Sequence, residues 1–115
     1  SCNRIYETPY QVSDSLLTSM GWKGSALLIV ADSSRTVQLG LRRLNEELKS
    51  EVQTVFPVGE DEQLDHIYSC DLFLQRPWTV VLLDDQRRIR GYYDPETREE
   101  VDRLIVELKI LLKKY

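Results

Sequence analysis

The stretch Arg76-Pro77-Trp78-Thr79-Val80-Val81-Leu82-Leu83-Asp84-Asp85 places a proline directly before an apolar run of strand length. Because proline cannot donate a hydrogen bond to a sheet, we expect it at the first residue of the strand, at an edge or at a bulge. The run ends at two aspartates, and Gln86-Arg87-Arg88 predicts a tight turn into a second strand at 89–93. A helical pattern over 95–115 follows. The stretch therefore predicts a β-β-α unit that is opened by a proline.

The preceding residues predict a strand, a helix, a strand and a short helix. Residues 26–31 form a continuous apolar run, which is typical of a strand covered on both faces. Apolar residues then recur at helical spacing from Arg35 to about Ser50. Residues 52–58 predict a second strand that frays at the proline within it, and residues 63–70 predict a short helix after an acidic turn. The order β-α-β-α-β-β-α predicts a parallel pair joined to an antiparallel hairpin.

The chain has the length and composition of one globular domain. It has 115 residues, of which 42% are hydrophobic and 30% are charged, and this balance supports one sizeable core. Residues 1–20 are interpreted as an N-terminal arm, with a short helix capped by Ser13 or Asp14, and residues 21–115 as the main domain.

Charge and hydropathy exclude two classes of partner. The formal net charge is -4, whereas nucleic-acid binders concentrate lysine and arginine on one face, so no nucleic-acid partner is expected. No apolar run approaches the roughly 20 residues that span a bilayer, so no transmembrane segment is predicted in this chain.

The two cysteines, Cys2 and Cys70, are too few for a disulfide scaffold and too far apart in sequence for a zinc site. Because the chain begins at Ser1 without an initiator methionine, we expect an upstream segment to have been removed. Ser1-Cys2 is compatible with the remnant of a bacterial lipoprotein cleavage site, which would place a lipid anchor on Cys2. The alternative is an incidental cysteine in a loose arm.

Three segments carry a resemblance to a known family. Residues 82–94, followed by Glu99-Glu100-Val101-Asp102-Arg103-Leu104, resemble the C-terminal half of Sco-type proteins and related envelope thioredoxin-like proteins, and Trp22-Lys23-Gly24 resembles the entry to their first central strand. The resemblance implies a thioredoxin-like fold, which is an α/β fold of the three-layer α/β/α sandwich type with a mixed central sheet and a C-terminal helix. It also implies a cis peptide bond between Arg76 and Pro77, an uncommon conformation.

The chain departs from this family where the chemistry would be. The relatives carry a Cys-x-x-Cys or Cys-x-x-x-Cys pair in the loop after the first central strand, but residues 32–40 contain no cysteine. Sco-type copper sites also use a histidine where this chain has Gln75 or Arg76. Arg76 could imitate the arginine of peroxiredoxins, but the peroxidatic cysteine is missing too. No cofactor or metal is therefore expected, and we lean against an enzyme.

Two hypotheses for function follow. The first is a non-catalytic binding or accessory module that recognises a protein partner through the surface around Ser33, Ser34, Arg76, Pro77 and Trp78. The resemblance favours a periplasmic or extracytoplasmic location, with the cytoplasm as the alternative.

The second hypothesis is a weak thiol-dependent redox or metal-handling role, Sco-like or peroxiredoxin-like, that uses Cys70 and His66. These residues are four apart on the predicted short helix, which is a permissible spacing for two ligands. The simpler interpretation is a solvated surface histidine and a small buried cysteine.

Overall fold

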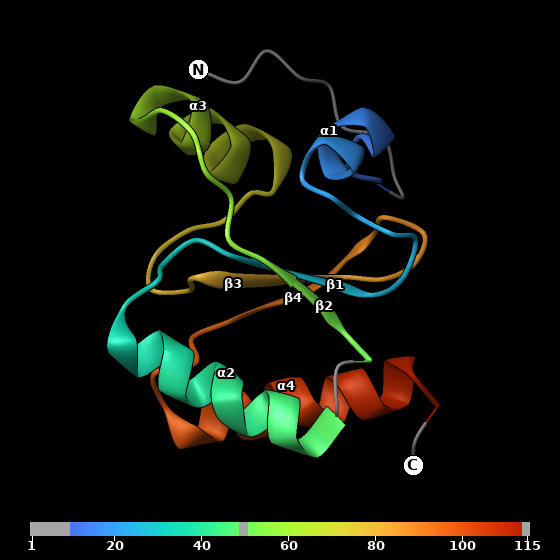
Figure 1. The fold of residues 1–115 in the computed structure, drawn as a ribbon, viewed down its shortest axis with the longest axis vertical. Helices are drawn as coiled ribbons and strands as arrows, with labels where there is room; N and C mark the ends of the chain where they lie inside the picture. Colours follow the sequence, from blue (N-terminus) through green and yellow to red (C-terminus); the bar gives the residue numbers. More distant parts are fainter. Residues whose placement is uncertain (1–9, 49–50, 114–115) are drawn as a thin grey trace.

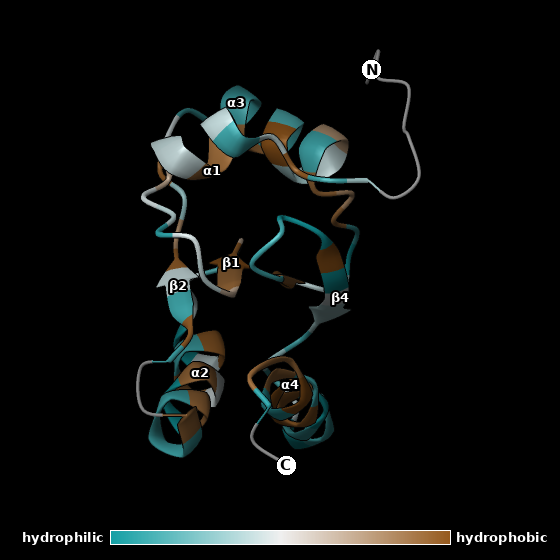
Figure 2. Ribbon diagram, turned by 90° about the vertical axis from the view of Figure 1, so that its right-hand side faces the viewer, coloured by the Kyte–Doolittle hydropathy of each residue, from teal (hydrophilic) through white to brown (hydrophobic). Residues whose placement is uncertain are grey.

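The protein is a mixed α/β structure in which helices cover both faces of a four-stranded sheet (Figure 1). The computed structural model describes residues 10–48 and 51–113. Its elements follow the order α1 (Asp14–Ser19), β1 (Leu27–Val30), α2 (Arg35–Leu48), β2 (Gln53–Val55), α3 (Asp61–His66), a π-helical turn η1 (Ile67–Asp71), β3 (Val80–Leu83), β4 (Ile89–Tyr93) and α4 (Arg98–Leu111). Figure 2 shows the layers edge-on, with α1 and α3 on one side of the sheet and α2 and α4 on the other.

The sheet has the strand order β2-β1-β3-β4. β1 pairs in parallel with β2 through the α2 crossover, and it pairs antiparallel with β3. β3 and β4 form an antiparallel hairpin with an irregularity at Leu82/Leu83. The predicted parallel pair and the predicted hairpin are therefore confirmed, and the sheet is mixed.

Each face of the sheet carries its own hydrophobic core. The α2 and α4 stripes pack on one face with Leu28, Val30, Val80 and Leu82, while the segment 10–22, η1 and Leu72 pack on the other face with Leu27, Ile29, Val81 and Leu83. All of β1 and β3 is buried, which explains why both strands read as continuous apolar runs. Tyr93 is buried in the core beside α2 and α4, and Tyr92 is half-buried against the other core, because successive side chains of a strand point to opposite faces.

Several element boundaries differ from the predicted ones. The strand predicted over 52–58 is ordered as a strand only from Gln53 to Val55 and ends before Phe56 and Pro57. α3 begins at Asp61, inside the run predicted as an acidic turn, because carboxylates in a first helical turn are favoured by the helix dipole. The predicted helix over 95–115 begins later, at Arg98, because the Thr97 hydroxyl caps it by accepting a hydrogen bond from the Glu100 amide at 3.3 Å.

Pro77 lies in a turn ahead of β3 rather than in the strand. The peptide bond between Arg76 and Pro77 is cis, as predicted, and the Trp78 amide donates to the Gln75 carbonyl at 3.1 Å. The strand then begins at Val80.

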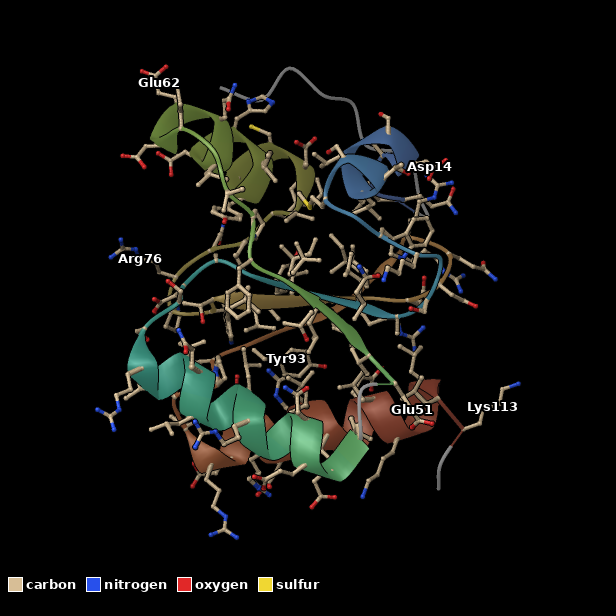
Figure 3. All side chains as sticks on the ribbon, viewed as in Figure 1. Asp14, Glu51, Glu62, Arg76, Tyr93 and Lys113 are labelled. Carbon is tan, nitrogen blue, oxygen red and sulfur yellow. The ribbon has the colours of Figure 1, made fainter. Side chains whose placement is uncertain are left out.

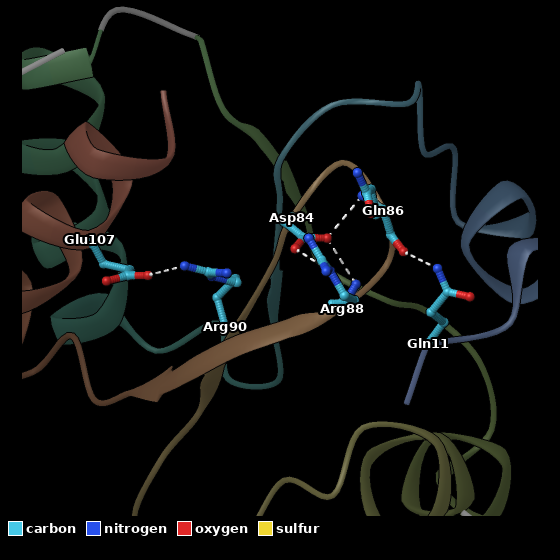
Figure 4. A network of polar contacts seen from close by, with 6 residues as sticks. All are labelled: Gln11, Asp84, Gln86, Arg88, Arg90 and Glu107. Atoms are coloured by element: carbon cyan, nitrogen blue, oxygen red, sulfur yellow. Dashed lines mark hydrogen bonds and ion pairs between the residues drawn. The ribbon is translucent and has the colours of Figure 1, made fainter. Parts of the chain in front are cut away.

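The hairpin turn is organised by the carboxylate of Asp84, the residue that follows β3. Asp84 is 2% exposed and accepts hydrogen bonds from the amides of Gln86 and Arg88 and from Arg88 Nε (Figure 4). Val12 exchanges hydrogen bonds with Arg87 of this turn: the Val12 amide donates to the Arg87 carbonyl at 2.8 Å, and Arg87 Nη1 donates to the Val12 carbonyl at 2.9 Å. The N-terminal segment is thereby joined to the hairpin.

Candidate functional site

The candidate site lies at the end of the sheet where β1 and β2 finish and β3 begins. The Ala31 amide donates to the Thr79 carbonyl at 2.7 Å, and the Thr79 amide donates to the Tyr93 carbonyl at 3.1 Å. These bonds extend the sheet by one residue and hold the proline turn beside the loop that follows β1. In open α/β sheets, the carboxyl ends of the strands are where ligands usually bind.

A pocket of about 660 Å³ opens between this proline turn, the loop after β1 and the α3–η1 helix. Its lining residues are Ala31, Asp32, Asp65, Tyr68, Leu74, Arg76, Pro77, Trp78 and Thr79. Three predicted site residues, Arg76, Pro77 and Trp78, are thus brought together. Arg76 extends away from the body of the protein into solvent (Figure 3), and 40% of Trp78 is exposed.

The two predicted serines take different places. Ser34 caps α2: its hydroxyl accepts from the Val37 amide at 3.4 Å, while its own amide donates to an Asp32 carboxylate oxygen at 2.9 Å. Ser33 is exposed and does not line the proline-turn pocket, but it lines two neighbouring pockets. Ser34 therefore organises the loop, and Ser33 belongs to the adjoining surface.

Two further pockets continue the surface toward β2. One, of about 560 Å³, shares Ala31, Asp65 and Tyr68 with the proline-turn pocket and adds residues of the segment after β2 and of α3. The other, of about 480 Å³, lies between α2 and β2 and shares Ser33 and Phe56 with the first. The side chains of Phe56 and Val58, 42% and 93% exposed, add to the apolar area of this surface.

Sequence reasoning missed Asp65, Tyr68 and Phe56 as site residues. Tyr68 is half-buried and lines two pockets. Burial raises the pKa of its hydroxyl, and the nearby Asp65 charge raises it further, so the phenol stays protonated and can donate a hydrogen bond. Of these residues, only Phe56 could have been found from the sequence, because it and Val58 are apolar residues on either side of Pro57, where the predicted strand frays.

The residues of the thiol or metal hypothesis lie apart from these pockets. His66 is exposed at the end of α3, whereas Cys70 is 6% exposed in η1, and neither lines the three pockets. Cys70 is disulfide-bonded and therefore presents no thiol in this state. Cys2, the other cysteine in the sequence and the predicted lipid site, lies outside the described residues.

The described residues contain neither a metal-binding cluster nor a membrane-spanning helix. Within residues 10–48 and 51–113, no three His, Cys, Asp or Glu side chains gather in a way that could hold a metal ion. No helix in the same part of the chain combines the length and the apolar character that crossing a membrane requires.

Comparisons with known proteins leave the chain without an assigned relative. No protein-family model matches it, and neither a curated protein nor a solved structure shows a significant similarity.

Proposed function

We propose that this chain is a thioredoxin-like domain, similar to the Sco-type envelope proteins, that acts as a non-catalytic module for binding a protein partner. The observation that carries the proposal is the proline-turn pocket, which has an exposed tryptophan on its wall but neither a thiol nor an imidazole among its lining residues. The strand order and the β-α-β-α-β-β-α sequence of the main elements support the fold assignment.

The polar groups of the loop after β1 support binding rather than catalysis. Ser34 and Asp32 are engaged with each other and with the start of α2, where they shape the loop. A serine nucleophile needs an adjacent base, and the only histidine, His66, lies outside the pocket. The pocket offers an indole, a phenol, a guanidinium and two carboxylates, a set that suits recognition of side chains.

A location outside the cytoplasm is part of the proposal. Disulfides persist in oxidising compartments and are rare in the cytosol, so the disulfide at Cys70 supports a periplasmic or extracytoplasmic site. Cys2 is the only other cysteine in the sequence, and a cysteine sulfur in a disulfide cannot also carry a thioether-linked lipid. Intact-mass measurement of the protein isolated from its host distinguishes a lipid on Cys2 from a disulfide.

The first test measures the redox and metal-binding activities that a non-catalytic module should lack. Reduction of a protein disulfide, consumption of peroxide and binding of copper are measured on the purified protein and on Cys70→Ser. We expect no activity above background in either protein. A robust rate that disappears in Cys70→Ser would overturn the proposal in favour of the thiol-dependent role.

Partner binding is tested by photo-crosslinking in the host. A photoreactive side chain is placed at position 78 and, as a matched control, at position 106, where Val106 is 58% exposed on α4 on the other side of the sheet. We expect a discrete crosslinked product from position 78 and none from position 106. Equal products from both positions, or none from either, would contradict a partner at the proline-turn face.

A further inference from the structure

The two outer strands of the sheet are protected very differently. At the β4 edge, the Tyr92 carbonyl accepts a hydrogen bond from Arg103, and the Asp94 amide donates to Glu100 Oε1 at 3.1 Å. Alternate residues of a strand form their backbone hydrogen bonds with the same neighbour. Gly91 and Tyr93 bond to the β3 side, so the backbone groups of Tyr92 and Asp94 point away from β3. Side chains of α4 thus occupy the outer edge of β4, which is one way in which proteins prevent further strand pairing.

The β2 edge has no such cover in the described part of the chain. The Gln53 amide donates to the Ala26 carbonyl at 3.2 Å, and in a parallel pair alternate residues bond to the same neighbour. Gln53 and Val55 therefore face β1, while the amides and carbonyls of Thr54 and Phe56 point outward. No hydrogen bond from beyond the β1–β2 pair reaches the backbone of either residue among those described. Pro57 follows the same alternation as Gln53 and Val55, so its missing N–H would have pointed toward β1. The proline therefore removes no amide donor from the open edge.

Pockets flank this open edge on both sides. The pocket between α2 and β2 is lined by Leu41 and Phe56 together with Arg42. The pocket on the other side includes Val58 and Leu64 together with Asp61 and Asp65. Side chains of an added strand would alternate between these two recesses, since successive residues of a strand point to opposite faces.

We propose that the β2 edge binds an extended segment of a partner protein by strand addition, and that this segment carries a basic residue opposite Asp61 and Asp65. The mode of binding is backbone pairing to Thr54 and Phe56, with side chains seated in the flanking pockets. Charge selects the occupant: the wall beside the edge is acidic and the net charge is -4. A second copy would bring a second acidic wall into the same interface. The inference rests on the proposed binding role and adds the class of partner.

The test uses random decapeptides displayed on phage, selected against the purified protein, with the enriched sequences then made as synthetic peptides. We expect apolar and basic residues to alternate in them. Amide hydrogen exchange of Thr54 and Phe56 should be fast in the free protein and slow at least tenfold in the complex, whereas the amides of Gln53 and Val55 are already protected by β1. This readout reports strand pairing directly.

Two chemical controls leave the fold intact or nearly so. Methylating alternate backbone nitrogens of the peptide should abolish binding in one register and leave it nearly unchanged in the other, because an added strand uses every second amide. Phe56→Ala should weaken binding about tenfold, the effect of losing about 1.4 kcal/mol of contact. Val106→Ala, on the opposite side of the sheet, should leave binding unchanged.

The outcomes separate this inference from the proposed function. Peptides that shift the Trp78 indole resonance without protecting Thr54 and Phe56 would overturn strand addition and leave the binding role standing. Selection that enriches no peptide would overturn strand addition, whereas the crosslinking at position 78 decides the binding role by itself. If the amides of Thr54 and Phe56 were protected from exchange in a dimer without peptide, the occupant of the β2 edge would be a second copy of this chain and not a partner segment.

Discussion

Glu100 and Arg103 form a two-point ion pair on α4, with Arg103 Nε 2.8 Å from Glu100 Oε2 and Arg103 Nη2 3.0 Å from Glu100 Oε1. The same arginine stacks over the Tyr93 ring at 4.1 Å from its centroid and reaches the Tyr92 carbonyl. The pair therefore links the first turn of α4 to the last residues of β4. It also covers the β4 edge of the sheet, whereas the opposite edge, at β2, has no such cover in the described part of the chain.

This ion pair predicts a dependence of stability on pH. The hydrogen bond from Arg103 lowers the pKa of Glu100 below its usual 4.5, against a smaller opposing effect of burial. A carboxyl whose pKa is lower in the folded state stabilises the fold above its unfolded pKa, and this contribution is lost as the pH falls through the folded pKa. We expect Glu100→Gln to be less stable than the wild type at pH 7 and the difference to close below pH 4.5.

Urea denaturation at pH 7 and at pH 3 checks this expectation. Glu99→Gln is the matched control, because Glu99 is an exposed neighbour in the same helical turn. A difference between wild type and Glu100→Gln that stays constant from pH 7 to pH 3 would contradict the role of the ion pair.

Asp84→Ala tests the buried carboxylate of the hairpin turn. The substitution removes the acceptor of two turn amides and of Arg88 Nε, and leaves those donors to water or without partners. We expect a loss of about 2–3 kcal/mol in the free energy of unfolding, measured from the denaturation midpoint. Asp85→Ala changes the exposed neighbour and should alter stability by less than about 0.5 kcal/mol. Similar losses in both variants would show that the carboxylate of Asp84 has no special role.

Gly40→Ala tests the contact between α2 and the turn before α4. An alanine normally stabilises a helix interior by about 1 kcal/mol relative to glycine. Here its Cβ would overlap the Pro95 carbonyl oxygen and lie 3.2 Å from Pro95 Cβ, so the two segments would have to separate. We expect a loss of about 1–3 kcal/mol, read as a lower melting temperature. Leu39→Ala, at an exposed neighbouring position, is the control, and a stabilised Gly40→Ala would disprove the close contact.

Replacing two threonines by valine should have opposite effects on stability. The Thr79 hydroxyl is buried and has no hydrogen-bond partner in the described part of the chain, so Thr79→Val should be neutral or stabilising. The Thr97 hydroxyl caps α4, so Thr97→Val should cost about 1 kcal/mol. Denaturation of the two variants side by side checks both, and a larger loss in Thr79→Val would mean that its hydroxyl is bonded.

Local sequence patterns were sufficient to predict most of the helices and strands, the parallel strand pair and the hairpin. Buried strands such as β1 and β3 are continuous apolar runs, and α2 and α4 carry apolar stripes at helical spacing, so local patterns are sufficient to predict them. The hairpin followed from its turn residues, and the cis bond at Pro77 followed from the family resemblance. Segment boundaries at Val55, Asp61 and Arg98 were less predictable, because capping and dipole effects act on single residues.

Only the tertiary structure decided what surrounds each of these residues. The position of Asp65 and Tyr68 in one pocket with the proline turn, the burial of Asp84 and the cover of β4 by Arg103 all depend on how different elements pack together. The unequal protection of the two sheet edges has the same origin. Periodicity along a chain reports which face of an element is buried, but not which distant side chain reaches an unpaired backbone group, because that depends on how the helices pack across the sheet.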